Sequence, residues 1–126
     1  MPVPTDRKYL ETHEWHQLNG DVVTIGITQI AADDLTDITY VKLPAVGAKV
    51  NANAAFGEIE SVKATADLNS GVSGTVTAVN TELTANPGLV NSDPFGKGWM
   101  LKVKVAGSNE LAKLLSAEEY LKKAGH

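Results

Sequence analysis

Hydrophobic and polar positions alternate along much of this chain, with the two-residue period typical of β-strands. The clearest segment is Val22 to Ile27, where Val23, Ile25 and Ile27 fall on one face. Four further segments show the same pattern: Asp37 to Leu43, Ala55 to Val62, Gly71 to Val79 and Met100 to Val105. Turn-forming residues lie between them: Asn19-Gly20, Asn86-Pro87-Gly88, Asp93-Pro94 and Gly96-Lys97-Gly98. The pattern predicts a mainly β fold, a sandwich or flattened barrel of short antiparallel strands.

Helices are expected only at the periphery. Thr28 to Leu35 predicts one short helix, and the C-terminal segment has two helix-start signals. These are Ser108-Asn109-Glu110 and the capping box Ser116-Ala117-Glu118-Glu119. We expect the apolar stripe of Leu111, Leu114 and Leu115 to lie against the sheet. The chain is therefore predicted to form a single domain over residues 1–126, with its core at about 8–105 and a C-terminal helical segment at about 108–124.

Composition excludes several classes of function. The 126 residues carry a net charge of −4 without a cluster of Lys or Arg, so we expect no nucleic-acid partner. No apolar run approaches the roughly 20 residues that span a bilayer, and residues 1–8 lack the apolar region of a secretory signal. We therefore expect a cytoplasmic bacterial protein without a membrane partner, a mature mitochondrial form being the alternative. The absence of cysteine excludes disulfides, thiolate metal sites and a cysteine nucleophile.

Catalytic and metal-binding arrangements are also absent from the sequence pattern. His13-Glu14-Trp15-His16 has the wrong spacing for the two histidines of a zinc protease, and the chain has only three histidines. Ser73 lacks the Gly-x-Ser-x-Gly context of a hydrolase nucleophile. We expect Glu58 and Glu60 to share an exposed strand face, where carboxylates are usually solvated. The prediction is therefore no catalytic residues and no metal site.

The segment from Gly57 to Asn69 is more informative. Ile59 has the position of a core-facing strand residue and Leu68 that of a returning strand, so the chain must reverse near Val62-Lys63-Ala64. This site lacks the Asn-Gly or Asp-Gly pair of a two-residue hairpin, and a β-branched valine resists positive φ. Lys63 is then either an ordinary surface lysine on a continuing strand, as most lysines are, or a lysine presented at a hairpin tip for acylation. The residue pattern leaves both interpretations open.

Ordered motifs from about Lys8 to Val105 resemble the H proteins of the glycine cleavage system. The run Glu60-Ser61-Val62-Lys63-Ala64 resembles the lipoylation site of that family. The motifs before it are Lys8-Tyr9, Thr12-His13-Glu14-Trp15, Gly26-Ile27-Thr28, Ala31-Ala32-Asp33-Asp34-Leu35 and Val41-Lys42-Leu43-Pro44. Those after it are Ser73-Gly74-Thr75-Val76, Asn86-Pro87-Gly88-Leu89-Val90-Asn91, Asp93-Pro94-Phe95-Gly96 and Gly98-Trp99-Met100.

This resemblance implies a lipoyl-domain-like fold with a peripheral C-terminal helix and a covalent lipoyl group on Lys63. It implies a non-catalytic carrier that takes the aminomethyl group of glycine from a pyridoxal-phosphate-dependent glycine decarboxylase (P protein) to a tetrahydrofolate-dependent aminomethyltransferase (T protein). It also implies that electrons pass to dihydrolipoamide dehydrogenase (L protein) and that a lipoyl-attaching enzyme is a further partner. The dithiolane ring would supply the sulfur redox chemistry that a cysteine-free chain lacks.

Two acidic residues are candidates for a cleft that shelters the loaded arm. We hypothesise that Glu14 and Asp67 receive its cationic amine. The alternative is that Glu14 orders the region of Trp15 and that Asp67 caps a turn. Trp15 and Trp99 are assigned to packing.

The sequence departs from the family pattern at a few positions. Gly71 stands where a proline is usual, which should loosen the turn before the next strand. Thr36 replaces a usual glycine, and Gln29-Ile30 replaces a common acidic–aromatic pair.

Three other functions compete with this interpretation. Biotinyl carriers favour Met on both sides of the lysine and 2-oxo acid dehydrogenase lipoyl domains favour Asp before it, whereas this chain has Val62 and Ala64. A paralogue that relays lipoyl groups to other enzymes and an unmodified interaction domain both remain open.

Overall fold

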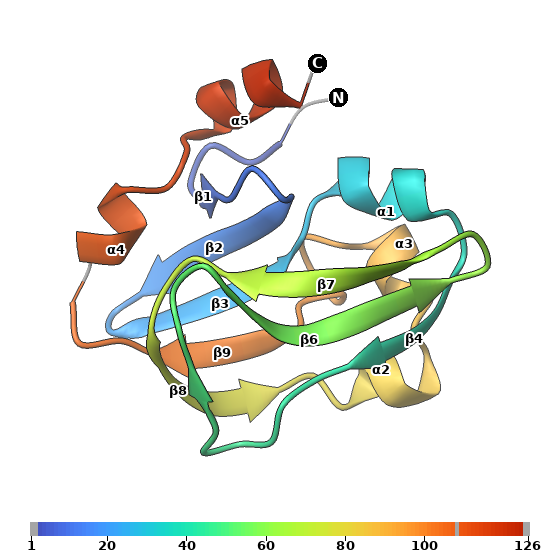
Figure 1. Cartoon of the computed structure of the whole chain (residues 1–126), viewed down its shortest axis with the longest axis horizontal. Helices are drawn as coiled ribbons and strands as arrows, with labels where there is room; N and C mark the ends of the chain where they lie inside the picture. Colours follow the sequence, from blue (N-terminus) through green and yellow to red (C-terminus); the bar gives the residue numbers. More distant parts are fainter. Residues whose placement is uncertain (1–2, 108, 125–126) are drawn as a thin grey trace.

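Two antiparallel sheets form the body of the structure. The computed structural model describes residues 3–107 and 109–124. The six-stranded sheet has the order β1 (Lys8–Tyr9), β2 (Glu14–Asn19), β3 (Val22–Ile27), β9 (Leu101–Lys104), β8 (Gly74–Val79) and β5 (Lys49–Val50). The three-stranded sheet has the order β4 (Ile38–Lys42), β6 (Ala54–Ser61) and β7 (Thr65–Ser70). The smaller sheet lies in front of the larger one in Figure 1, and the two remain separate. The predicted mainly β class is confirmed, in its sandwich form.

The main hydrophobic cluster draws buried side chains from both sheets. Val23 and Ile25 of β3 enter it from the larger sheet, and Ile59 of β6 and Leu68 of β7 enter it from the smaller one. Full burial of a side chain of this size contributes about 1.5–3 kcal/mol. The alternation seen in the sequence therefore fixes which face of each strand the other sheet covers.

Five short helices surround the sheets in the described part of the chain. They are α1 (Gln29–Leu35), α2 (Glu82–Ala85), α3 (Leu89–Ser92), α4 (Asn109–Ala112) and α5 (Ala117–Lys123). Helix α5 packs on a second hydrophobic cluster that contains Tyr9, Trp15 and Tyr120. The cluster joins the C-terminal helix to β1 and β2. Among the described residues, no helix is both long enough and apolar enough to cross a membrane.

Most predicted elements are confirmed with small shifts of their ends. Helix α1 begins after Thr28, whose hydroxyl accepts a hydrogen bond from the Ala31 N–H, and the capping box at Ser116 is present. The helix-start signal at 108 involves a residue outside the described ones. The expected packing of the leucine stripe is confirmed for Leu111 and Leu114, which lie against the main hydrophobic cluster. It was wrong for Leu115, because α4 ends at Ala112 and Leu115 pairs with Tyr9, with both N···O distances 2.8 Å.

Three features of the sheets and connections differ from the sequence prediction. Strands β1, β2 and β5 and helices α2 and α3 were not predicted, and the segment Gly71 to Val79 contributes only Gly74–Val79 to β8. Asn86-Pro87-Gly88 connects α2 to α3 and is not a simple turn between strands. These differences leave the two-sheet arrangement unchanged.

Gly71 ties the smaller sheet to β2. Its N–H donates a hydrogen bond to Nε2 of buried His16 over 2.9 Å, a bond that a proline at this position could not form. A Cβ at position 71 would also lie 2.8 Å from both δ-methyl carbons of Leu114. The glycine that was expected to loosen this turn thus provides an anchor for it.

Candidate functional site

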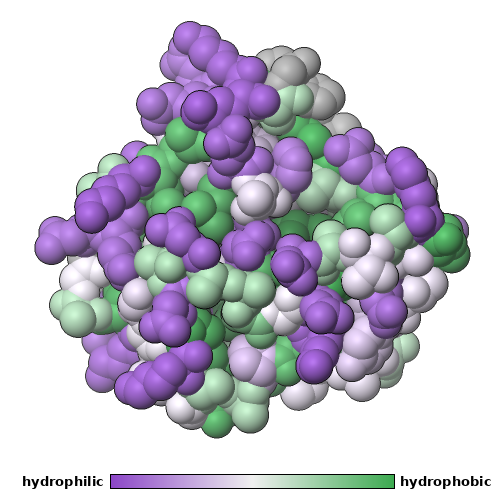
Figure 2. All heavy atoms as spheres, viewed as in Figure 1, coloured by the Kyte–Doolittle hydropathy of each residue, from purple (hydrophilic) through white to green (hydrophobic). Residues whose placement is uncertain are grey.

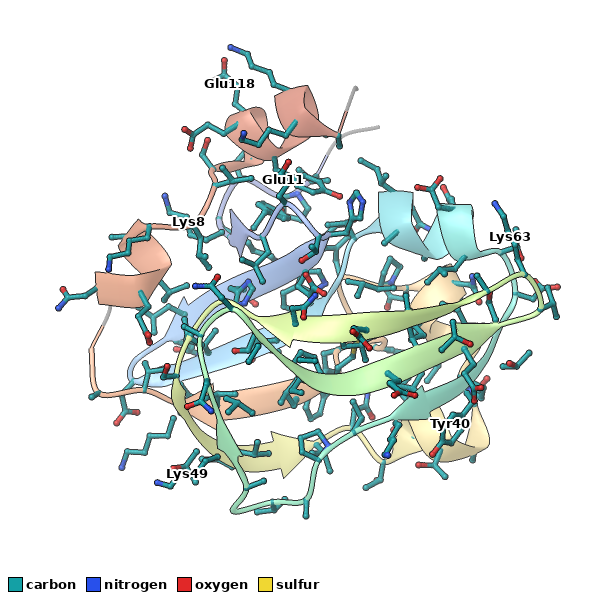
Figure 3. All side chains as sticks on the ribbon, in the orientation of Figure 1. Lys8, Glu11, Tyr40, Lys49, Lys63 and Glu118 are labelled. Atoms are coloured by element: carbon teal, nitrogen blue, oxygen red, sulfur yellow. The ribbon has the colours of Figure 1, made fainter. Side chains whose placement is uncertain are left out.

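The β6–β7 hairpin places Lys63 at its tip. The last pair in the ladder joins Glu60 to Thr65, and residues 62–64 form the reversal between the strands. Figure 3 shows the Lys63 side chain at the free end of the hairpin, beside α1. Its neighbour Val62 is 70% exposed. The predicted reversal is confirmed, and Lys63 lies at a hairpin tip and not on a continuing strand.

A serine side chain builds this tip without the usual turn residues. The Ser61 Oγ accepts hydrogen bonds from the N–H groups of Lys63 and Ala64, at 3.2 and 3.0 Å. The Ser61 N–H donates to the Ala64 carbonyl at 2.8 Å. Neither Val62 nor Lys63 has positive φ. A local serine–backbone arrangement therefore replaces the Asn-Gly chemistry that the sequence lacks.

The amine of Lys63 lies against the end of α1. Its Nζ donates a hydrogen bond to the backbone oxygen of Asp34 over 3.2 Å, in an exposed position. Asp34 belongs to the last turn of α1, where carbonyl oxygens have no partner within the helix and carry partial negative charge. One exposed hydrogen bond of this kind leaves the amine accessible to a modifying enzyme.

A cavity of about 150 Å³ opens beside this amine. Apolar side chains of α1 and of the hairpin form much of its wall, and Asp34 lies at its edge. Its lining residues are Thr12, His13, Glu14, Ile27, Ala31, Asp34, Leu35, Ile59, Ala66, Asp67 and Leu68. Because Asp34 both lines the cavity and binds the Lys63 amine, the tip of the lysine lies at the cavity margin. The structure also brings Glu14 and Asp67, 53 positions apart in sequence, into this one wall.

Glu14 is the buried acid of the cavity. Its side chain is held by Thr12 Oγ1, which donates to Oε1 at 2.5 Å, and by the Asn69 N–H, which donates to Oε2 at 2.8 Å. Burial disfavours the charged form and raises the pKa of Glu14 to about 7, although the hydrogen bonds act in the opposite direction. At neutral pH the carboxyl group therefore exchanges readily between its neutral and charged forms.

Asp67 lies on the open side of the same wall. It is an exposed residue within β7, paired across the ladder with Glu58 of β6. The alternative that Asp67 caps a turn is therefore wrong. Because Asp67 is exposed to solvent, its electrostatic effect on a bound cation is weaker than that of a buried acid.

Several residues around the cavity were not singled out from the sequence. His13 has a φ of 86°, which turns the chain between Thr12 and Glu14, and Asn69 supplies a backbone donor from the far strand. Neither role leaves a pattern in the sequence, since backbone donors and dihedral angles are set by the fold. The motif containing residues 12–15 was the one available signal for this corner.

The two tryptophans are part of the packing, as predicted. Trp15 is buried, and its Nε1 donates a hydrogen bond to the Pro94 oxygen over 3.0 Å. Gly26 leaves room for the indole, because a Cβ at position 26 would lie 2.7 Å from two of its carbons. Trp99 packs against the second hydrophobic cluster.

Known proteins of one family share both this sequence and this fold. Residues 7–126 match the family described as glycine cleavage H-protein. The probable glycine cleavage system H protein of Natronomonas pharaonis is 53% identical, over 94% of this chain and 93% of that protein. The mitochondrial glycine cleavage system H protein of Pisum sativum is 50% identical, over 91% of this chain and 70% of that protein.

A solved structure extends the similarity to three dimensions. The crystal structure of a glycine cleavage system H protein from Mycobacterium marinum matches with a TM-score of 0.90 and 37% identity. The match covers 98% of this chain and 100% of that one. This chain belongs to the glycine cleavage H-protein family, a family of lipoyl carriers in glycine catabolism.

Proposed function

We propose that this chain is the carrier of the glycine cleavage system and that lipoate is attached through an amide to Nζ of Lys63. The observation that carries the proposal is the position of this lysine, accessible at a hairpin tip and at the margin of a cavity. Membership of the H-protein family supports it. The attached dithiolane ring would supply the redox-active sulfur pair that this cysteine-free chain lacks.

The residues around Lys63 fit a flexible attached arm. The Ser61 turn fixes the backbone under the lysine, while the lysine amine donates an exposed hydrogen bond to the Asp34 oxygen. Ile59, Ala31 and Leu35 offer the cavity an apolar wall that suits an aliphatic chain. A rigid base with a mobile arm raises the local concentration of the cargo at each partner.

Catalysis is assigned to the partners. The carrier would receive the aminomethyl group of glycine at the P protein, deliver it to the T protein and pass electrons to the L protein. A lipoyl-attaching enzyme would modify Lys63 beforehand. We place these reactions in the bacterial cytoplasm, or in the mitochondrion for a mature organelle form.

Attachment is tested by mass spectrometry of the protein expressed with a lipoyl-attaching enzyme and a lipoate supply. We expect one lipoyl group on the Lys63 peptide, no addition to the Lys63→Arg variant and normal addition to the matched Lys49→Arg variant. Purified glycine decarboxylase should then act on the wild-type adduct. An unmodified Lys63 peptide would refute the carrier function, and modified protein inactive with the decarboxylase would point to a lipoyl-relay paralogue.

The cavity is proposed to shelter the cationic amine of the cargo next to Glu14 and Asp67. Because a charge-assisted hydrogen bond contributes about 1.5–3 kcal/mol, we expect Glu14→Gln to accelerate spontaneous loss of the cargo by about tenfold. Asp67→Asn should have a smaller effect, since Asp67 is exposed. The measurement is the decay of the loaded protein followed by mass spectrometry.

Glu58→Gln is the matched control for this experiment. Glu58 lies opposite Asp67 on the same hairpin but does not line the cavity, so its substitution should leave the decay rate unchanged. Equal decay of wild type, Glu14→Gln and Asp67→Asn would show that the cavity plays no sheltering role.

A further inference from the structure

The hydroxyl group of Tyr120 lies between two elements that line the cavity. Tyr120 belongs to α5, outside the two sheets, and its side chain is fully buried. Its oxygen lies 2.6 Å from Nδ1 of His13 and 2.7 Å from Oγ1 of Thr28. The ring stacks on Tyr9, with 5.0 Å between the ring centroids. The ring also meets the His13 ring edge-on, with 5.6 Å between the centroids. The C-terminal helix therefore reaches the wall of the cavity through the Tyr120 side chain.

Both hydrogen-bond partners of Tyr120, His13 and Thr28, connect it to the cavity wall. His13 is itself a lining residue, and it stands between Thr12 and Glu14, whose side chains are hydrogen-bonded to each other. Thr28 is the N-cap of α1, the helix that contributes Ala31, Asp34 and Leu35 to the wall. The Thr28 N–H also donates to the His13 oxygen over 3.0 Å. Tyr120 thus reinforces the junction of the two elements that frame the cavity.

The available donors and acceptors favour one direction of donation along the hydrogen bonds from Thr28 through Tyr120 to His13. The Thr28 Oγ1 already accepts the Ala31 N–H, at 3.4 Å, and Thr28 is fully buried. If Thr28 donates its hydroxyl hydrogen to Tyr120, and Tyr120 donates to His13 Nδ1, each hydroxyl hydrogen has an acceptor. The reverse direction would leave the buried Thr28 hydrogen without an acceptor among these groups, which is costly. His13 then accepts at Nδ1 and carries its proton on Nε2 when neutral.

We propose that Tyr120 is a positioning residue of the arm cavity, holding the His13 ring in its Nε2–H tautomer and the start of α1 in register with the corner at residues 12–14. This inference rests on the proposed function in one respect only, that the cavity receives the cargo of Lys63. It gives the C-terminal helix a role in the site in addition to covering apolar surface.

Tyr120→Phe tests the proposal, because it removes the hydroxyl group and keeps the ring. Tyr9→Phe is the matched control: it removes a hydroxyl from the same stacked pair, one that donates to the Pro4 oxygen at 2.5 Å and does not contact the cavity wall. The first readout is the ¹⁵N NMR spectrum of the His13 ring in unmodified protein. We expect Tyr120→Phe to shift the ratio of the two neutral tautomers about fivefold toward Nδ1–H, and Tyr9→Phe to leave it unchanged.

The second readout is the decay of the loaded protein. We expect Tyr120→Phe to accelerate cargo loss several-fold and Tyr9→Phe to match the wild type, with His13, Glu14, Asp34 and Asp67 intact in both variants. Identical ¹⁵N spectra for the two variants would overturn the positioning role, and so would identical decay rates when Glu14→Gln loses its cargo faster than the wild type. Failure of the proposed function has a different signature, namely wild-type protein that loses its cargo as fast as Glu14→Gln.

Discussion

Glu14 and His16 lie two residues apart on β2, and burial shifts their pKa values in opposite directions. The pKa of Glu14 rises to about 7 from 4.5, and the pKa of His16 falls to about 4 from 6.5. In both cases burial is the main cause, because it disfavours the charged form. Each group is therefore held mainly neutral at mildly acidic pH.

The two shifts have opposite consequences for stability. The contribution of Glu14 is fully present below about pH 4.5 and is lost as the pH rises through about 7. The contribution of His16 is fully present above about pH 6.5 and is lost as the pH falls through about 4. Between pH 4.5 and 6.5 the unfolded chain binds an extra proton at His16, and the folded chain an extra proton at Glu14. The contributions of the two groups to the pH dependence of the free energy of unfolding therefore cancel in this interval.

Substituting one of the two groups should reveal the pH dependence of stability that the other one causes. In Glu14→Gln, the free energy of unfolding should fall as the pH drops from 6.5 to 4.5, by up to about 1.4 kcal/mol per pH unit. In His16→Gln it should fall as the pH rises over the same interval. Urea denaturation at several pH values measures both, and slopes of the same sign in the two variants would contradict the assignment.

At the scale of elements, the connection between α1 and β4 is held in a strained conformation. Thr36 ends α1 with φ 62° and ψ −145°, a region that glycine adopts freely and other residues rarely. Asn91 of α3 fixes this link, since its Nδ2 donates to the Thr36 oxygen at 2.7 Å and its Oδ1 accepts the Ile38 N–H at 3.0 Å. The strain falls at the position where the family usually has glycine.

Thr36→Gly should therefore stabilise the protein. Removing the strain contributes about 1–3 kcal/mol, and the added freedom of the unfolded chain offsets about 0.5–1 kcal/mol of it. We expect a net increase of about 1 kcal/mol in the free energy of unfolding, measured by urea denaturation. The control is Asn53→Gly, at a φ of 65° that asparagine tolerates, where the change should stay within about 0.5 kcal/mol. A Thr36→Gly variant less stable than wild type would contradict the strain.

Strands with an apolar face could be predicted from the sequence, and β2 could not. The strands that form the core keep the period of two, as in Val22–Ile27. In β2, Glu14, Trp15 and His16 are all buried, so the alternation disappears. Glu14 Oε2 and His16 Nε2 accept hydrogen bonds from the N–H groups of Asn69 and Gly71, each donor 55 positions further along the chain. Only the folded chain brings these partners together.

At the scale of the whole molecule, the site has two parts. The Lys63 tip is built from residues adjacent in sequence, and the cavity is built from segments far apart in sequence. The Lys63 tip depends on residues 61–64 and could be predicted from a short motif. The cavity depends on β2, α1, the β6–β7 hairpin and, through Tyr120, on α5. Glu14 and Asp67 were hypothesised from the sequence to share a cleft for the cationic amine, whereas the contribution of the C-terminal helix required the structure.

The two faces of the smaller sheet differ in polarity. Polar side chains are spread over the outer face of the smaller sheet, including Glu58, Glu60 and Asp67, whereas the hydrophobic cluster lies behind it. Figure 2 shows this face as hydrophilic residues interspersed with smaller hydrophobic areas. The carrier thus presents a solvated face next to its attachment lysine.

The serine-built turn also affects how this protein can evolve. Because the Ser61 hydroxyl stabilises the reversal and neither tip residue adopts positive φ, positions 62 and 63 are free of any requirement for glycine or asparagine. The side chain at position 62 can diversify under selection by a modifying enzyme while Lys63 and the shape of the hairpin are kept. A substitution at the tip can therefore change how the modifying enzyme recognises the protein without unfolding the hairpin. A library randomised at Val62 would measure the preference of that enzyme with little interference from misfolding.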